Sequence, residues 1–431
     1  MITISEIALH WHSNHQTNAD MRSLFSAMLF TLLCFSAMGQ CDGNRYRNFL
    51  FTDFAKTADI IYGENLNKDG LLEELKMDVY VPEGDVSTER ALIIISHGGF
   101  FLGGDKAEAD VVPFCEDFAR MGYVVASINY RMGIEFETPL NVPYGKTVVR
   151  AVQDLRAAIR WFRQDAEGGN QFGINPDEIY TGGVSAGGFM AIHLAYMDDE
   201  EIPDYIDMTA PGLEGGLEGE SGNPGYSSEV NAIFNISGAI GDTAWIDAGE
   251  LPVCLFHGDA DATVPFDSDT FYLFGIMEVV ELDGSNSIDQ KLTQVGIEHC
   301  FEINEGYGHV PHMGNEEVYD TTLSIISNFL SHYICGNELD CTYREIETIV
   351  SVEEQNEAQI NIWPNPSHTG AFRFSADTPI MSLQVSDSAG REVWSALNPK
   401  SGSILLPTPG FYILHAVLID GKMISRRLIV E

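Results

Sequence analysis

The stretch Gly183-Val184-Ser185-Ala186-Gly187 decides the fold expected for this chain. An apolar run at 178–184 predicts a buried strand directly before it, and 187–196 predicts a helix directly after it. So sharp a turn needs glycine on both sides of the serine, because other side chains would clash, and it exposes the hydroxyl at the carboxyl edge of a sheet. The stretch therefore predicts that Ser185 is a nucleophile rather than part of an ordinary glycine-rich turn.

Apolar runs and amphipathic stretches alternate on both sides of this turn. Strands are expected at 76–81, 91–96, 123–129, 178–184, 232–236, 252–256 and 300–304, and helices at 107–121, 147–162, 187–196, 267–277 and 316–333. Strands separated by helices predict an α/β fold, with a mostly parallel sheet covered on both faces. The strands before Gly104 have no helix between them and are expected to form an antiparallel edge.

A glycine-rich loop, His97-Gly98-Gly99-Phe100-Phe101-Leu102-Gly103-Gly104, follows the expected strand at 91–96. Acyl transfer creates an oxyanion, and backbone N–H groups in such a loop can point at it. We expect Gly99 and Phe100 to supply donors there, together with Ala186, which directly follows the nucleophile. The histidine at the start of the loop is expected to brace it by hydrogen bonding.

A serine nucleophile needs a base, and the base needs an orienting carboxylate. The expected strand at 252–256 leads into a loop that holds Asp259 and Asp261. The expected strand at 300–304 leads into a loop that holds His309 and His312. The order serine, aspartate, histidine predicts one acid and one base from these loops.

The motifs H-G-G, G-x-S-A-G-G, H-G-x-x-D-x-x-V-P and a glycine-flanked histidine together resemble the α/β-hydrolase superfamily, in its branch of secreted bacterial carboxylesterases. The resemblance covers residues 62–333. Carried over residue by residue, it implies that Ser185 is the nucleophile, Asp261 the acid and His309 the base, with His312 as second choice.

The resemblance implies a serine carboxylic ester hydrolase with an acyl-enzyme intermediate and no cofactor or metal. Its substrates would be short-chain esters, or acetyl and feruloyl esters linked to polysaccharides. Phe100 occupies the place of a third glycine in the fuller loop and would narrow the pocket on the acyl side. A lipase or peptidase of the same fold, and a non-catalytic hydrolase fold that binds at a surface, are the alternatives.

The net charge of the chain excludes strongly anionic partners. Its 64 Asp and Glu against 23 Lys and Arg give a net charge of -41, whose field repels nucleic acids and anionic lipid headgroups. A hydrophobic content of 45% fits a globular protein of two or three domains. The excess of acidic residues lies in residues 1–360, since 361–431 hold six basic and five acidic residues.

The first forty residues suggest export. Residues 21–39 combine Arg22, an apolar run and small residues at the end, as in a cleaved signal peptide. The run of about 12 residues falls short of the roughly 20 that span a bilayer, so no stable membrane insertion is expected. Residues 1–20 are expected to be an extension that is not native. In an oxidising compartment, Cys335 and Cys341 are expected to pair, because the loop between them is short.

Short alternating runs at 360–431, separated by turn signals, predict a small all-β sandwich after a linker at 346–359 and a catalytic domain at 40–345. Its motifs W-P-N-P, D-x-x-G-R, P-G-F-Y and a closing apolar strand resemble the C-terminal sorting domain of the type IX secretion system of Bacteroidetes. The resemblance implies a secreted or cell-surface protein that this machinery exports.

Residues 211–226, rich in Gly and Glu, follow the nucleophile helix and are expected to form either a flap over the site or a surface loop. No third ligand accompanies His309 and His312, so no metal site is expected there.

Overall fold

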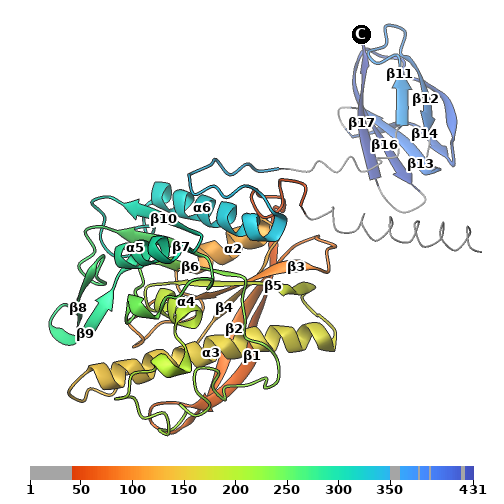
Figure 1. Ribbon diagram of the computed structural model, residues 1–431. Helices are drawn as coiled ribbons and strands as arrows, with labels where there is room; N and C mark the ends of the chain where they lie inside the picture. The colour runs from red at the N-terminus through yellow and green to blue at the C-terminus, as the bar shows by residue number, and fades with distance from the viewer. Residues whose placement is uncertain (1–40, 350–359, 377–378, 388–389, 419–422) are drawn as a thin grey trace, which may run out of the picture. The chain divides into compact units, whose positions relative to one another are not determined.

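The computed structural model describes residues 41–349, 360–376, 379–387, 390–418 and 423–431, of which 423–425 are described by their backbone alone (Figure 1). It divides into two compact units, Met1–Val350 and Ser351–Glu431. The expected extension and signal peptide, 1–39, lie outside the described residues, as do residues 350–359 of the expected linker. Residues 347–349 pair with Phe49 of the larger unit.

An eight-stranded sheet forms the centre of the larger unit, in the order β1-β2-β4-β3-β5-β6-β7-β10. The strands are β1 (Phe54–Leu66), β2 (Leu72–Pro82), β3 (Arg90–Ser96), β4 (Val124–Ile128), β5 (Ile174–Val184), β6 (Ala232–Ile236), β7 (Val253–Gly258) and β10 (His299–Asn304). All pairs from β4 to β10 are parallel, which confirms the predicted α/β class. The two antiparallel pairs in this sheet are β1 with β2 and β2 with β4. The expected antiparallel edge was therefore wrong for β3, which lies between two parallel neighbours.

Helices cover both faces of this sheet, as predicted. They are α2 (Val112–Arg120), α3 (Asn141–Gly168), α4 (Ala186–Tyr196), α5 (Ser285–Val295) and α6 (Glu316–Cys335). Helices α3, α4 and α5 share one hydrophobic core with one sheet face, and α2 and α6 share a second core with the other (Figure 1). Leu92 and Ile94 of β3 enter the first core, while Ile93 and Ile95 enter the second. Because successive side chains of a strand alternate between faces, a strand buried on both sides reads as a continuous apolar run. Among the described residues, no helix is both long and apolar enough to span a bilayer.

The helix expected at 267–277 was wrong. The chain forms a hairpin there, β8 (Ser268–Leu273) and β9 (Met277–Asp283). Phe271 and Leu273 are buried while Tyr272 between them is 43% exposed, a period of two that fits a strand. Phe274 and Gly275 adopt positive φ and turn the chain. Helix α5 follows the hairpin and was not expected.

The disulfide expected between Cys335 and Cys341 was also wrong. Cys335 bonds to Cys41, and Cys341 bonds to Cys300 of β10. Cys335 is the last residue of α6, and Gly336 turns the chain there in the left-handed conformation. The end of the helix thus directs the first cysteine toward the N-terminal segment, so nearness in the sequence did not bring the two sulfurs together. The remaining described cysteines, Cys115 and Cys254, are buried and free.

The smaller unit is the predicted antiparallel β-structure. Three strands, β11 (Ile360–Trp363), β12 (Ala371–Ala376) and β15 (Ser401–Leu405), form one sheet. Four strands, β13 (Ile380–Asp387), β14 (Glu392–Leu397), β16 (Gly410–Leu418) and β17 (Met423–Val430), form the other. The side-chain amide of Asn365, in the W-P-N-P motif, donates to the carbonyl of Arg427 and accepts from the N–H of Ile429. The motif therefore fastens the start of this unit to its last strand.

Candidate active site

Ser185 lies on the turn between β5 and α4, at the carboxyl end of the sheet. Its φ of 53° and ψ of -115° are unusual for a residue with a side chain. The Ser185 N–H donates to the carbonyl of Ile236 at 2.8 Å, which holds the turn. A Cβ on Gly183 would meet the backbone carbon of Gly187 at 2.3 Å, and one on Gly187 would meet the carbonyl oxygen of Ser96 at 2.0 Å. Both glycines are therefore required by close packing.

The loop after β10 brings His309 to the serine. Its Nε2 lies 2.9 Å from the Ser185 Oγ, and its Nδ1 lies 2.6 Å from the Asp261 Oδ2. A carboxylate only accepts, so the Nδ1–H donates to Asp261 and Nε2 is free to accept the serine proton. The structure thus brings together the three residues that the sequence singled out for nucleophile, base and acid.

Asp261 is held on both carboxylate oxygens. Its Oδ1 accepts the N–H groups of Thr263 and Val264, at 2.7 and 3.0 Å. Its Oδ2 accepts from His309 and lies 3.2 Å from the Nε2 of His257. Burial alone would raise the pKa of Asp261, but the hydrogen bonds from His257 and His309 outweigh burial and hold that pKa well below its usual range. Asp261 is therefore an anion at neutral pH.

His257, the last residue but one of β7, is a part of this site that sequence reasoning left without a role. Its Nε2 lies within 3.3 Å of the Val264 carbonyl as well as near Asp261, and both partners only accept. Nε2 therefore carries the proton, and Nδ1 accepts from the Ser285 hydroxyl at 2.8 Å. The available signal was its position in the H-G-x-x-D motif, at the end of a strand and four residues before Asp261.

The glycine-rich loop after β3 lies against the nucleophile. A Cβ on Gly98 would stand 3.3 Å from the Cβ of Ser185. The Gly98 N–H donates to Asp110, and the Nδ1 of His97 lies 2.7 Å from the Gly98 carbonyl, so the loop is braced on both sides. Within the described chain, the N–H groups of the three predicted oxyanion donors, Gly99, Phe100 and Ala186, make no hydrogen bond.

Phe100 has a φ of 58°, the region in which glycine is favoured, which accounts for the glycine expected at its place. Its ring lies 5.5 Å from the ring of Phe274, at the turn of the β8–β9 hairpin. A cleft of about 420 Å³ opens between this loop and the loop after β10, and Phe100, Ser185 and His309 line it. The cleft is therefore accessible from solvent at the reacting hydroxyl.

The alternative residues in the two loops, Asp259 and His312, have hydrogen-bond partners other than Ser185 and His309. The Nε2 of His312, the second-choice base, donates to the carbonyl of Asp110 at 3.2 Å, and burial lowers its pKa to about 4. Asp259 accepts from the N–H of Gly306 and so joins the two loops. Neither residue hydrogen-bonds to Ser185 or His309. In the described part of the chain, no three His, Cys, Asp or Glu side chains gather as they would around a metal ion.

The segment 211–226 is fixed to α3. The Gln153 side chain donates to the carbonyls of Leu213 and Gly216, at 3.0 and 2.7 Å, and Arg131 donates to the carbonyl of Gly212. None of these residues lines the cleft at Ser185. Of the two expectations for this segment, the structure favours a packed surface loop over a flap.

Part of this chain is similar to a family model and to known hydrolases. A family model described as BD-FAE matches residues 77–242, a segment that includes the glycine-rich loop and Ser185. Arylacetamide deacetylase of Oryctolagus cuniculus is 31% identical over 119 residues, which are 27% of each chain. Lipase 2 of Moraxella sp. (strain TA144) is 34% identical over 110 residues, 25% of this chain and 22% of the lipase. The chain thus spans about a quarter of the length of these curated relatives.

Among solved structures, the propionate-bound esterase Est2 of Thermogutta terrifontis covers 67% of this chain and 96% of its own, with a TM-score of 0.46 and 24% identity. The described sheet, with its parallel strands and its helices on both faces, has the architecture of the α/β-hydrolase fold.

Proposed function

We propose that this protein is a serine carboxylic ester hydrolase that works through an acyl-enzyme on Ser185. The observation that carries the proposal is the continuous chain of hydrogen bonds from the Ser185 hydroxyl through His309 to Asp261. Three N–H groups that have no hydrogen-bond partner in the described part of the chain, on Gly99, Phe100 and Ala186, lie on the loop and turn that adjoin this hydroxyl. A base, an orienting anion and oxyanion donors are the groups that acyl transfer requires.

In the proposed reaction, the Ser185 oxygen bonds to the ester carbonyl carbon as its proton passes to Nε2 of His309. The carbonyl oxygen becomes an oxyanion and accepts hydrogen bonds from the free N–H groups. The ester C–O bond then breaks, and His309 returns the proton to the departing alcohol. A water molecule repeats the sequence on the acyl-enzyme, so that the acid leaves and the serine proton is restored. Asp261 stabilises the imidazolium throughout but keeps its charge.

The central test of this proposal is Ser185→Ala. We expect the turnover of p-nitrophenyl acetate to fall by about 10⁴ to 10⁶-fold with the fold intact, because the variant lacks the nucleophile. Ser287→Ala, on α5 outside the cleft, is the matched control and should keep full activity. Circular dichroism checks folding. Undiminished turnover in Ser185→Ala would overturn the assignment, and an inactive but folded wild-type protein would favour the non-catalytic alternative.

For substrates, we propose short-chain esters, or acetyl and feruloyl esters linked to polysaccharides. The support is the resemblance of the motifs to carboxylesterases and the aromatic pair Phe100 and Phe274 beside the cleft. A panel of p-nitrophenyl esters of rising chain length, with acetylated xylan and methyl ferulate, tests it. The highest kcat/KM on long acyl chains would favour a lipase, and cleavage of peptides alone would favour a peptidase.

We also propose that residues 21–39 direct export and that 360–431 address the protein to type IX secretion. The sorting motifs support this, and so do two disulfides, which persist in oxidising compartments. In a Bacteroidetes host that carries this machinery, the full chain should reach the cell surface or the medium, and a chain without 360–431 should stay in the periplasm. Equal export of both chains would contradict the proposal.

A further inference from the structure

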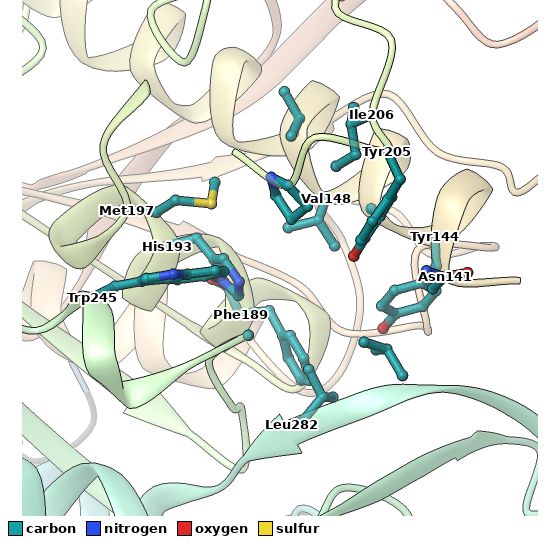
Figure 2. A pocket seen from close by; sticks show the side chains of 15 residues that line it. Asn141, Tyr144, Val148, Phe189, His193, Met197, Tyr205, Ile206, Trp245 and Leu282 are labelled. Carbon is teal, nitrogen blue, oxygen red and sulfur yellow. Dashed lines mark hydrogen bonds between the residues drawn. The ribbon is translucent and has the colours of Figure 1, made fainter. Parts of the chain in front are cut away.

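A second pocket lies beside α4, away from the cleft at Ser185. Figure 2 shows Trp245 and Met197 on one side of it, and Tyr144 and Tyr205 on the other. Its volume is about 60 Å³, and none of its lining residues also lines the cleft. A cavity that holds one water molecule needs about 10–15 Å³, so this pocket has room for more than a single water molecule.

The walls of this pocket favour a neutral ring. Helix α4 contributes Phe189, Met197 directly follows the end of this helix, and Trp245 and Tyr144 add aromatic faces. Aromatic faces pack well against a ring in offset or edge-to-face geometry. None of the lining residues is Asp, Glu, Lys or Arg. A charged ligand would therefore lose its hydration there without gaining an ionic partner.

One polar group in the wall is incompletely satisfied. His193, only 5% exposed, lies 2.8 Å through its Nδ1 from the carbonyl of Phe189. A carbonyl only accepts, so Nδ1 carries the proton of the neutral ring and Nε2 is left as an acceptor. Burial lowers the pKa of His193 to about 4, which keeps the ring neutral at neutral pH. Within the described residues, Nε2 has no hydrogen-bond partner.

Tyr144, only 4% exposed, is a second such group in the same wall. Its hydroxyl has no hydrogen-bond partner in the part of the chain that the structure describes, and burial raises its pKa. Neither the Nε2 of His193 nor the Tyr144 hydroxyl is completely buried, so a ligand in the pocket can form a hydrogen bond with each of them. The free acceptor on His193 therefore favours a ligand that donates a hydrogen bond.

We propose that this pocket is a binding site for a small, neutral, ring-shaped molecule that carries a hydroxyl group. The ring packs between Trp245 and Tyr144, and the hydroxyl donates to Nε2 of His193. The site goes beyond the proposed ester hydrolysis, because it shares no residue with the cleft.

Phenol and toluene are the matched probes, since they differ only by a hydroxyl in place of a methyl group. Isothermal titration calorimetry with the full chain should give phenol an affinity about 2- to 10-fold above that of toluene, as one net hydrogen bond provides. His193→Phe should remove this preference and leave the affinity for toluene within about twofold of wild type. His368→Phe, an exposed histidine of the smaller unit, is the control and should change neither value.

A second variant locates the ligand. A Cβ on Gly145 would stand 2.8 Å from the flexible end of Ile206, inside the pocket, so Gly145→Val fills it without opposing the helical backbone. Both probes should lose at least tenfold in affinity in Gly145→Val. The proposal is overturned if neither probe binds the wild-type protein, if phenol shows no preference, or if Gly145→Val binds both as wild type does.

Discussion

Ser185, Asp261 and His309 follow three different strands, and each stands at a carboxyl strand end. Parallel neighbours place those ends at one edge of the sheet, so the sequence could predict that the three would meet. The contact of His257 with Asp261 was not predictable in the same way. This contact depends on the path of the loop after β7, which folds back so that the Asp261 carboxylate lies against His257 of that strand.

His257 leads to a prediction about positioning. It touches Asp261 but neither Ser185 nor His309, so His257→Phe removes one of the hydrogen bonds that hold the acid. We expect kcat to fall by about tenfold with KM little changed, the cost of about one hydrogen bond in the transition state. Asp261→Asn should cost more, about 10³ to 10⁴-fold, because an amide cannot hold His309 in the required tautomer.

Steady-state kinetics on p-nitrophenyl acetate measures kcat and KM of both variants, His257→Phe and Asp261→Asn. His257→Gln restores a donor and should recover part of kcat, which a purely structural defect would not allow. A rise in KM alone, without a fall in kcat, would contradict the positioning role of His257.

Helices and strands were predicted correctly where one short-range sequence pattern dominated. Helix α3 was predicted from its apolar spacing, although it extends beyond the expected 147–162 at both ends. The β8–β9 hairpin was missed because its turn depends on a positive φ at Phe274, for which a phenylalanine gives no signal. Disulfide pairing depends on which segments the whole fold brings together, and the pairing of Cys41 with Cys335 spans 294 residues.

The fixing of 211–226 to α3 depends on a buried ion pair. Arg131 and Asp154 are fully buried, with an N–O distance of 2.8 Å, and Arg131 also donates to the carbonyls of Leu66 and Gly212. Asp154→Ala leaves the guanidinium buried without its anion. We expect the free energy of unfolding to fall by about 3–5 kcal/mol.

Urea unfolding of Asp154→Ala, followed by circular dichroism, measures this loss. The exposed pair of Lys68 and Asp69 offers the comparison, since Asp69→Ala should change stability by about 1 kcal/mol or less. Similar effects of both substitutions would contradict a structural role for the buried pair.

For the whole molecule, nearly all of the net charge of -41 resides with the larger unit and its N-terminal residues, and the smaller unit is nearly neutral. The sequence predicts a linker at 346–359, and the two compact units are Met1–Val350 and Ser351–Glu431. Composition is a bulk property and can locate a boundary, whereas it gives no information on which substrate the cleft accepts.

Buried neutral histidines make stability depend on pH. Burial lowers the pKa of His193 and of His312 to about 4, below the value of about 6.5 for an exposed histidine. Between those values the unfolded chain binds protons that the folded chain does not, so stability falls as pH falls from about 6.5 toward 4. Each histidine contributes a slope of up to about 1.4 kcal/mol per pH unit.

His193→Phe should remove one of these slopes. Urea unfolding at intervals from pH 7 to pH 4.5 should show the variant losing less stability than wild type as the solution is acidified. Parallel curves for the two proteins would mean that His193 has the same proton affinity in the folded and unfolded chains.

We propose that Ser185 is an activated nucleophile in a water-accessible cleft. The most direct test of this role is reaction of the folded protein with a fluorophosphonate, followed by mass spectrometry of the intact chain and its peptides. We predict one adduct per chain, on Ser185, with loss of ester hydrolysis in proportion to labelling. A folded chain that stays unlabelled, or that carries its adduct on another residue while Ser185 is unmodified, would contradict this role of Ser185.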